Sequence, residues 1–332
     1  MKILVTGGAG YLGSLTCTAL ERAGHVPIVL DSLVTGPRAF VGGRVLYEGD
    51  VADRALVRRI ADDHPDLDAT LHMAGRIVVP ESVAQPVLYY RENVVKSLVL
   101  FDELASLGLP RVLFSSSAGV YAPTTTMVVD EDSPLAPASP YTRTKAMAEA
   151  VLADLAAAGR LRPVVLRYFN PIGSDPGLTS GVHAREPSHV LAQLARAALG
   201  QQPAFTLAGT DWPTRDGTGL RDYVHAWDLA RAHVRALERI DELTSKPAAV
   251  TINIGTGVGV TVRELITTFE EVFGRHVPVV EGPPRPGDTA GTYADVRRAA
   301  DLLGWRAELG LADGIASALA WHGARRAVLG YD

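Results

Sequence analysis

The chain opens with a short β-branched run that leads directly into a glycine loop, and this combination limits the possible folds more than any other feature. Residues 2–6 (Lys-Ile-Leu-Val-Thr) predict a buried strand. The glycines in 7–13 fit both Gly-x-Gly-x-x-Gly and Gly-x-x-Gly-x-x-Gly, and an amphipathic stretch that ends at Gly24 follows. Glycines spaced in this way allow a tight turn, close approach of the backbone to a pyrophosphate, and close packing of a helix on a strand. We therefore predict a strand, a phosphate-binding loop and a helix.

A carboxylate stands at the end of the next predicted strand, residues 26–30. Asp31 lies 18 residues after Gly13. In dinucleotide-binding units an acidic residue at about this distance accepts hydrogen bonds from the adenosine ribose. Because the same carboxylate would repel a 2′-phosphate, we expect the cofactor to be NAD rather than NADP.

Strands alternate with helices through the first half of the chain. Strands are expected near 2–6, 26–30, 45–47, 69–73, 111–114 and 164–166, and helices near 54–62, 87–107 and 140–157. This alternation predicts an α/β fold with a Rossmann-type, doubly wound parallel sheet that is covered by helices on both faces. Ligands of such sheets lie beyond the carboxyl ends of the strands.

The alternation ends at Asn170, where loops rich in Pro and Gly begin, and a strand near 250–255 is expected to return to the sheet. We therefore expect two domains. The first is an NAD-binding Rossmann domain of residues 1–169 with a returning segment at about 224–260. The second is a smaller α/β C-terminal lobe, made of 170–223 and 261–332, that binds the substrate.

Composition excludes several classes of function. The net charge of the 332 residues is −5 and no basic block is present, so nucleic acid and membrane surfaces are poor partners. The single cysteine, Cys17, excludes an internal disulfide framework, and the nine histidines lack the spacing of metal ligands. No apolar run approaches the length of a membrane span and the first strand leaves no room for a signal peptide, so we expect a cytoplasmic protein.

Tyr141 and Lys145 stand four residues apart at the start of the predicted helix 140–157. Ser139 is suited to cap this helix and Pro140 to its first turn, so the phenol and the ammonium fall on one helical face. A cation in that place favours the phenolate, and we expect it to lower the pKa of Tyr141 below the usual value of about 10. The pair therefore predicts a base that works near neutral pH.

The most distinctive stretch is 209–225, Gly-Thr-Asp-Trp-Pro-Thr-Arg-Asp-Gly-Thr-Gly-Leu-Arg-Asp-Tyr-Val-His. With the glycine loop, Asp31, Ser117, Tyr141 and Lys145, this stretch resembles the extended short-chain dehydrogenase/reductases, and within them the UDP-glucose 4-epimerase family. The same family is indicated by 114–117 (Phe-Ser-Ser-Ser), 167–171 (Arg-Tyr-Phe-Asn-Pro) and 285–288 (Arg-Pro-Gly-Asp). The resemblance covers nearly the whole chain.

The resemblance implies NAD-dependent epimerisation at C4 of a UDP-hexose, UDP-glucose or UDP-galactose, through a transient 4-keto sugar. Tyr141 would take the proton from the sugar O4 while C4 passes hydride to NAD. Lys145 would bind the nicotinamide ribose, and Ser117 would hydrogen-bond O4 and relay the proton. Arg221 and Arg285 would hold the diphosphate.

The resemblance also implies the remaining ligand-binding residues. The cofactor would be bound by Gly7, Gly10, Tyr11, Leu12, Gly13, Asp31, Asp50, Val51, Met73, Ala74, Gly75, Asn93, Ser115, Tyr141, Lys145 and Tyr168. The UDP-sugar would be bound by Ser117, Tyr141, Asn170, Arg221, Arg285, Asp288 and Thr292. The family usually pairs through two long helices, here 87–107 and 140–157, so a homodimer is expected.

Thr292 stands seven residues after Arg285, at a position that borders the 2-substituent of the sugar in this family. A bulky Tyr there restricts the family to glucose and galactose, whereas a small residue admits the N-acetyl sugars. A shift of one residue would place Gly291 or Tyr293 at this position instead. We expect turnover of UDP-N-acetylglucosamine as well, unless Thr292 only forms a turn.

Other residues also have a second interpretation. Arg221 could form an ion pair with Asp222 or a neighbouring residue instead of binding a phosphate, and Asp50 could be a helix cap. Tyr11 could be a packing residue. Asp228 is expected to cap a helix at 229–237.

The chain departs from the family at two places near the ligands. Arg76 and Ile77 stand where the epimerases often have a cofactor-contacting Lys, and His189-Val190 replaces Asn-Leu. These changes leave open a 4-epimerase of another UDP-sugar, such as UDP-glucuronate or a UDP-pentose. Because Ala118 rather than an acid follows Ser117, a dehydratase is disfavoured. The sequence also leaves open a net nucleotide-sugar oxidoreductase and a non-catalytic NAD-sensing regulator.

Overall fold

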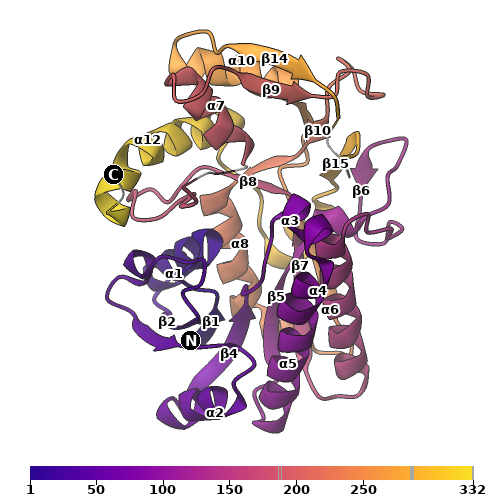
Figure 1. Cartoon of the computed structure of the whole chain (residues 1–332). Helices are drawn as coiled ribbons and strands as arrows, with labels where there is room; N and C mark the ends of the chain where they lie inside the picture. The colour runs from indigo at the N-terminus through magenta and orange to yellow at the C-terminus, as the bar shows by residue number, and fades with distance from the viewer. Residues whose placement is uncertain (186, 188, 285–287, 331–332) are drawn as a thin grey trace.

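The computed structural model of this protein describes residues 1–185, 187, 189–284 and 288–330. Its largest element is a seven-stranded parallel sheet with the order β12-β7-β5-β4-β1-β2-β3 (Figure 1). The strands are β1 (Lys2–Thr6), β2 (Val26–Asp31), β3 (Val45–Glu48), β4 (Leu67–His72), β5 (Arg111–Ser117), β7 (Arg162–Tyr168) and β12 (Val250–Ile254). The order reverses between β1 and β4, where ligands of such sheets bind. The predicted Rossmann-type, doubly wound sheet is confirmed.

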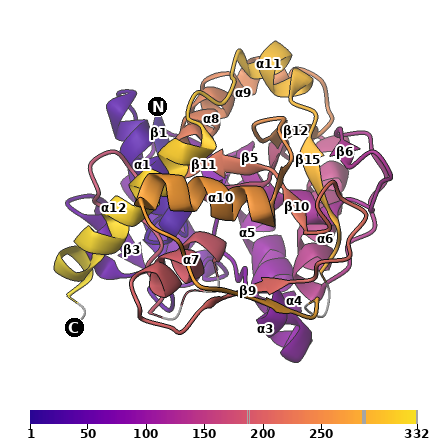
Figure 2. The ribbon, with the colours of Figure 1, turned by 90° about the horizontal axis from the view of Figure 1, so that it is seen from above.

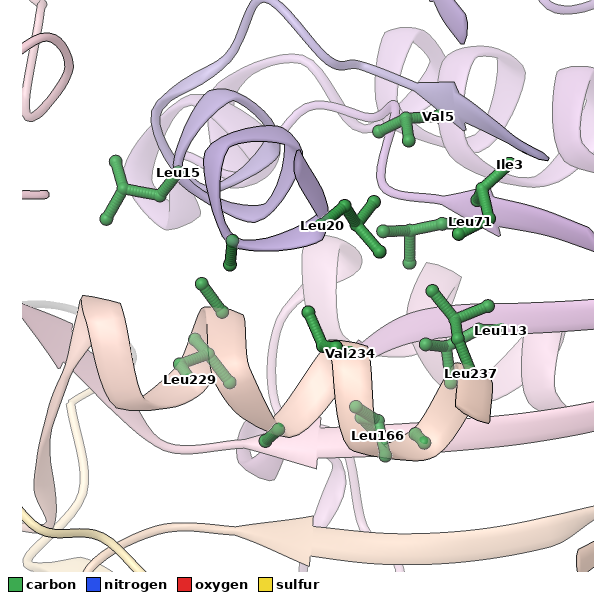
Figure 3. Packing of buried hydrophobic residues seen from close by; sticks show 14 of the residues in the cluster. Ile3, Val5, Leu15, Leu20, Leu71, Leu113, Leu166, Leu229, Val234 and Leu237 are labelled. Carbon is green, nitrogen blue, oxygen red and sulfur yellow. The ribbon is translucent and has the colours of Figure 1, made fainter. Parts of the chain in front are cut away.

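Helices cover both faces of the sheet because successive strand residues point to opposite sides and both sides are apolar. On one face Phe114 of β5 packs with α2 (Arg54–Asp63), α5 (Lys96–Ser106) and α6 (Pro140–Ala157). On the other face, its neighbour Leu113 packs with α1 (Tyr11–Arg22) and α8 (Ala226–Glu238), as Figure 3 shows. The two helical layers hold the strand ends in fixed positions.

A smaller α/β region, formed mostly by residues that follow β7, lies above the sheet in Figure 1. Its helices are α7 (Val190–Ala198), α10 (Val262–Phe273) and α12 (Leu311–Leu329), and α10 packs against α12 (Figure 2). Its strands are β6 (Val128–Val129), β8 (Asn170–Ile172), β9 (Phe205–Ala208), β10 (Leu220–Arg221), β11 (Tyr223–His225), β13 (Val260–Thr261), β14 (Val279–Gly282) and β15 (Gly291–Ala294). They form one sheet of order β13-β10-β15-β6 and the pairs β11-β8 and β14-β9.

The helix predicted near 87–107 consists of three consecutive segments. These are α4 (Pro86–Tyr90), a π-helical turn (Arg91–Val95) and α5. A π turn adds a residue to the helix and changes which side chains face inward, and such turns are frequent at functional sites. Here the turn buries the Asn93 side chain.

The chain crosses between the two regions more than once. Besides α8 and β12, helix α11 (Arg297–Leu303) packs on the first region, where Ala299, Leu303 and Trp305 lie in the core of the sheet. The division into domains stays a prediction.

The remaining helices are α3 (Val79–Ala84), α9 (Ile240–Leu243) and the 3₁₀ turns Arg38–Val41 and Ala118–Val120.

The cap predicted for the helix near 229–237 is wrong. Helix α8 begins three residues earlier, at Ala226, and its cap is His225, whose Nδ1 accepts the Trp227 N–H at 3.0 Å. Asp228 lies within the first turn, where its carboxylate accepts the N–H groups of Glu308 and Leu309 at 2.8 and 2.7 Å.

Within the described residues, no helix has the length and apolar character needed to span a membrane.

Candidate active site

The glycine loop connects β1 to α1 at the reversal of strand order. Gly7 has a left-handed φ of 73°, and a Cβ there would lie 2.7 Å from the backbone nitrogen of Ala74, after β4. A Cβ on Gly13 would lie 2.1 Å from the Gly7 carbonyl oxygen. Because larger residues would force the segments apart, these glycines allow β1, β4 and α1 to converge.

The N-terminus of α1 is suited to bind a pyrophosphate. Its N-cap is Gly10, which has no capping side chain, and its first turn has no acidic residue. The N–H of Ser14 is the first to bond within the helix, to the Gly10 carbonyl at 2.9 Å, so Tyr11, Leu12 and Gly13 have no intrahelical partner for their N–H groups. These N–H groups and the helix dipole favour an anion. The described residues therefore fit the diphosphate of NAD.

Asp31 is buried at the end of β2, beside the glycine loop. One carboxylate oxygen accepts the Ala9 N–H at 2.9 Å and the other accepts the Leu33 N–H at 2.8 Å. Each carboxylate oxygen has a second lone pair for a ribose hydroxyl. Asp31 thus also fixes the loop, a role that the sequence pattern did not reveal.

Asp50 and Val51 follow β3 at the same edge of the sheet. Asp50 accepts the Ala52 N–H at 2.9 Å and forms an ion pair with Lys96, so it is not the cap of α2, which is Asp53. Val51 packs into the core on this side. Tyr11 donates its hydroxyl to the Gly173 carbonyl at 2.6 Å and therefore connects α1 to the smaller region.

Met73, Ala74 and Gly75 follow β4 and lead to Arg76. The Arg76 guanidinium contacts Glu81 at 3.2 Å, whereas its backbone is held by Asn93. Nδ2 of Asn93 also donates to the Thr144 hydroxyl of α6 at 3.1 Å. Asn93 therefore fixes the loop after β4 against the helix that contains Tyr141.

Helix α6 begins where the sequence predicted it. Ser139 and Thr142 form a reciprocal capping box, with Pro140 in the first turn. This start buries both Tyr141 and Lys145. The Lys145 ammonium donates to the Ser115 carbonyl at 2.8 Å and lies 4.8 Å from the centre of the Phe114 ring.

The predicted lowering of the pKa of Tyr141 is wrong for the protein by itself. Burial raises the pKa of the phenol, and a hydrogen bond with Ser117 opposes this effect only in part. Burial also lowers the pKa of Lys145 to about 8. The two effects have one cause, which is that each charged form loses contact with water.

Ser115, Ser117 and Tyr168 lie at the carboxyl ends of β5 and β7. Ser117 accepts the Gly119 N–H at 3.1 Å. The Ser115 hydroxyl lies 3.0 Å from Nε2 of His233, whose Nδ1 faces the Leu229 carbonyl at 2.8 Å. Since a carbonyl only accepts, Nδ1 has the proton and Nε2 accepts from Ser115.

Burial lowers the pKa of His233 to about 4, so its ring is neutral. Burial raises the pKa of Tyr168, and the Ser115 hydroxyl opposes this effect in part. The sequence indicated no role for His233. This residue lies on α8, 118 residues from Ser115 along the chain, and no local pattern connects the two.

Arg221 lies on β10 and does not pair with Asp222. Its guanidinium donates to the carbonyls of Leu220, Ala290 and Thr289 at 2.7, 3.3 and 3.3 Å. The Asp222 carboxylate instead accepts from the N–H groups of Thr256, Gly257 and Ala294 and from the Thr256 hydroxyl. The ion pair of Arg221 with Asp222 is therefore wrong, and among the described residues no other acidic side chain pairs with Arg221.

Thr292 lies in a strand rather than a turn. It is paired with Arg221 in the parallel ladder between β10 and β15. Paired residues of neighbouring strands share a face of the sheet, whereas Tyr293 points to the other face. Gly291 has a φ of 115°, and a Cβ there would lie 1.7 Å from the Leu220 carbonyl oxygen.

Two further predicted residues lie at the edges of this group. Asn170 is exposed at the start of β8, and its N–H donates to the Asp222 carbonyl at 2.9 Å. Asp288 precedes β15 and is partly buried. Arg285 lies outside the described residues.

Comparison with known proteins identifies the family. Residues 3–255 match the NAD dependent epimerase/dehydratase family. The UDP-glucose 4-epimerase of Azospirillum brasilense is 42% identical over 323 residues, which are 97% of this chain and 92% of the relative.

Two solved structures are similar over nearly their whole length. The crystal structure of UDP-glucose 4-epimerase from Stenotrophomonas maltophila, with bound NAD and formylated UDP-arabinopyranose, has a TM-score of 0.93 and 37% identity, and 98% of each chain is covered. The UDP-Glc/GlcNAc 4-epimerase of Campylobacter jejuni has a TM-score of 0.82 and 32% identity, covering 97% of this chain and 99% of the other. The chain therefore belongs to the NAD dependent epimerase/dehydratase family and, within it, to the UDP-glucose 4-epimerases.

Proposed function

We propose that this protein interconverts UDP-glucose and UDP-galactose by epimerisation at C4, with NAD as its cofactor. The observation on which this proposal rests most is that Tyr141 and Lys145 are both buried, one helical turn apart on α6, with Ser117 at the end of β5 close enough to lower the pKa of the phenol. These groups lie at the carboxyl ends of the strands, as does the glycine loop. NAD, when bound, supplies the hydride chemistry, and the protein supplies orientation and proton transfer.

Tyr141 is the group we propose to hold and move the proton of the sugar O4. Its raised pKa keeps the phenol protonated in the protein alone, so it becomes a base only when positive charge approaches. Lys145 lies one helical turn away, and NAD, when bound, would add the positive charge of its nicotinamide ring. The Ser117 hydroxyl, which lowers the pKa of the phenol, can bridge it to O4.

Arg221 is the residue we propose to bind the substrate diphosphate. Its guanidinium contacts backbone carbonyls, and no acidic side chain among the described residues pairs with it. Its charge is therefore available to a phosphate, which a planar guanidinium binds well. Arg285, Asp288 and Asn170 are proposed to complete the nucleotide-sugar site.

We propose that the enzyme also accepts UDP-N-acetylglucosamine. Thr292 is paired with Arg221 and lies on the same face of the sheet, so a short side chain borders the space next to the proposed phosphate ligand. The Campylobacter jejuni relative is named for both UDP-Glc and UDP-GlcNAc. The Thr292 hydroxyl can also donate to an acetamido oxygen.

A second copy of the chain is the proposed partner. Val87, Val95 and Leu98 of the α4–α5 segment and Met147 of α6 are 77%, 53%, 49% and 45% exposed, and the segment and α6 lie side by side in Figure 1. Apolar side chains grouped in this way are typical of a protein interface. Sedimentation velocity of the wild type and of Leu98→Glu tests the dimer. We expect the wild type to sediment as a dimer and the variant as a monomer.

A cytoplasmic location stays a prediction.

The activity is tested on purified protein with UDP-galactose and no added cofactor. We expect UDP-glucose to appear, without net consumption of NAD, when products are separated by anion-exchange chromatography. The same assay with UDP-glucuronate and with UDP-xylose shows whether the enzyme converts another UDP-sugar in preference to UDP-galactose. Oxidised sugar accumulating with NADH, or no conversion even after NAD is added, would contradict the proposal.

A further inference from the structure

A buried ion pair lies directly behind the proposed catalytic residues. Glu149 of α6 is one helical turn after Lys145, and Arg167 of β7 immediately precedes Tyr168. Nη2 of Arg167 lies 2.6 Å from Oε2 of Glu149, and Nε lies 3.1 Å from both carboxylate oxygens. Both side chains are more than nine-tenths buried.

The same carboxylate accepts a hydrogen bond from the Ser116 hydroxyl. Ser116 immediately precedes Ser117 on β5 and is paired with Arg167 in the parallel ladder between β5 and β7. One carboxylate therefore connects the helix of Tyr141 and Lys145 to the two strands that end in Ser117 and Tyr168.

Arg167 extends these contacts to the returning strand. Its Nη1 donates to the Tyr121 hydroxyl at 3.0 Å and to the Glu131 carbonyl at 3.3 Å. The Tyr121 hydroxyl in turn donates to Asn253 of β12 at 2.6 Å. Every nitrogen of the guanidinium thus has a partner, which fixes its orientation.

Stability alone does not account for such a pair. Replacing a buried ion pair by apolar residues of similar volume is often neutral or stabilising, because desolvation offsets the attraction between the charges. What the pair provides is direction, since a guanidinium and a carboxylate meet in a fixed geometry. Here the fixed geometry joins the elements that contain the reacting groups.

We propose that Glu149 and Arg167 are positioning residues of the 4-epimerase, which, with Ser116, hold the turn that contains Lys145 against the strand ends that contain Ser117 and Tyr168. This inference rests on the activity proposed above. It assigns no contact with substrate or cofactor to either residue.

Glu149 also acts on Lys145 electrostatically. Burial lowers the pKa of Lys145 to about 8, and the charge of Glu149 opposes that effect. The other titratable group that interacts with Lys145 among the described residues is His72 of β4, and burial, with the charge of Lys145, lowers the pKa of His72 to about 3. Because His72 is neutral, Glu149 is the anion that favours the ammonium form.

The test compares Glu149→Gln with two controls in the intact enzyme. Asp154→Asn removes an exposed carboxylate from the same helix. Glu103→Gln removes a buried carboxylate, paired with Arg54 and Arg58, from α5. We measure kcat and KM for UDP-galactose across pH, and thermal stability.

Glu149→Gln is expected to lower kcat by roughly 10- to 100-fold with little change in KM, since small displacements of reacting groups have effects of this size. The basic limb of its kcat–pH profile is expected at lower pH than in the wild type. Both controls should keep the wild-type kcat and profile, although Glu103→Gln will be less stable. Wild-type kcat and profile in Glu149→Gln, or equal losses of kcat in Glu149→Gln and Glu103→Gln, would overturn the proposal.

Ser116→Ala decides the question if Glu149→Gln does not fold. It removes only the bond between β5 and the carboxylate, so it should lower kcat several-fold at unchanged KM. Unchanged kcat in this variant would overturn the positioning role. A wild-type protein without epimerase activity would overturn the proposed function and this inference together, whereas full activity in these variants refutes this inference alone.

Discussion

The ammonium of Lys145 donates to the main-chain carbonyl of Ser115 at 2.8 Å, deep between α6 and β5. The ammonium is therefore directed at the strand that ends in Ser117. A lysine buried in this way should leave a measurable signature in the dependence of stability on pH.

We predict that the wild type gains stability, relative to Lys145→Met, as pH rises from about 8 to about 10.4. The pKa of Lys145 is lowered to about 8 in the folded protein, against about 10.4 in the unfolded chain. In that interval the unfolded chain still binds the proton that the folded chain has released, so rising pH favours the folded state, by on the order of 3 kcal/mol in total. Urea unfolding at several pH values measures this difference. Lys246→Met, which changes an exposed lysine, should show no such trend.

Tyr141→Phe is expected to lower turnover of UDP-galactose by more than about a hundredfold, because general acid–base catalysis typically contributes 10²–10⁴. Lys145→Ala should lower it similarly. Folding should remain intact in Tyr141→Phe, since the substitution keeps the buried ring and removes only the hydroxyl. Tyr47→Phe, which removes a hydroxyl bonded to Asp63, is the matched control. Near wild-type activity in Tyr141→Phe would refute the proton-transfer role.

Asp31 is predicted to make the protein prefer NAD over NADP. Isothermal titration on cofactor-stripped protein measures both affinities. Asp31→Asn should reduce the ratio of the affinities for NAD and NADP. The amide oxygen still accepts a hydrogen bond, but the negative charge that repels a 2′-phosphate is gone. Asp62→Asn, at an exposed position of α2, should change neither affinity. Equal affinities of the wild type for the two cofactors would rule out the ribose assignment.

Thr292→Tyr is predicted to abolish turnover of UDP-N-acetylglucosamine while UDP-glucose turnover remains. The larger ring would fill the face that Thr292 shares with Arg221. Tyr293→Thr, on the opposite face of β15, should leave the ratio of kcat/KM for the two sugars unchanged. If the wild type does not convert the N-acetyl sugar at all, Thr292 is not a gate of this kind.

Local signals predicted the fold and the start of the catalytic helix well. Ser139 and Pro140 indicated where α6 begins, and the structure has its first helical residue at Pro140. The glycine loop likewise lies between β1 and α1 as predicted. Such features depend on residues close together in sequence, whose backbone preferences act whatever the rest of the chain does.

Contacts between distant residues could not be predicted in this way. His233 meets Ser115 across 118 residues, and Arg167 meets Tyr121 across 46. The pKa of Tyr141 was predicted with the wrong sign because the spacing to Lys145 shows a nearby cation but not the burial that outweighs it. The π-helical turn at Arg91–Val95 was also missed, since a pattern of period 3.6 does not reveal one added residue.

The position of β12 has a consequence for how the chain folds. This strand pairs along β7, yet about 80 residues separate the two in sequence, so the sheet stays incomplete during synthesis until residues 250–254 emerge. Until then the β7 edge is an unpaired strand edge of the kind that promotes aggregation. A fragment that ends at residue 169 is therefore expected to be a poor stand-alone NAD-binding unit, because part of the smaller region is inserted between β7 and β12, two neighbouring strands of the sheet.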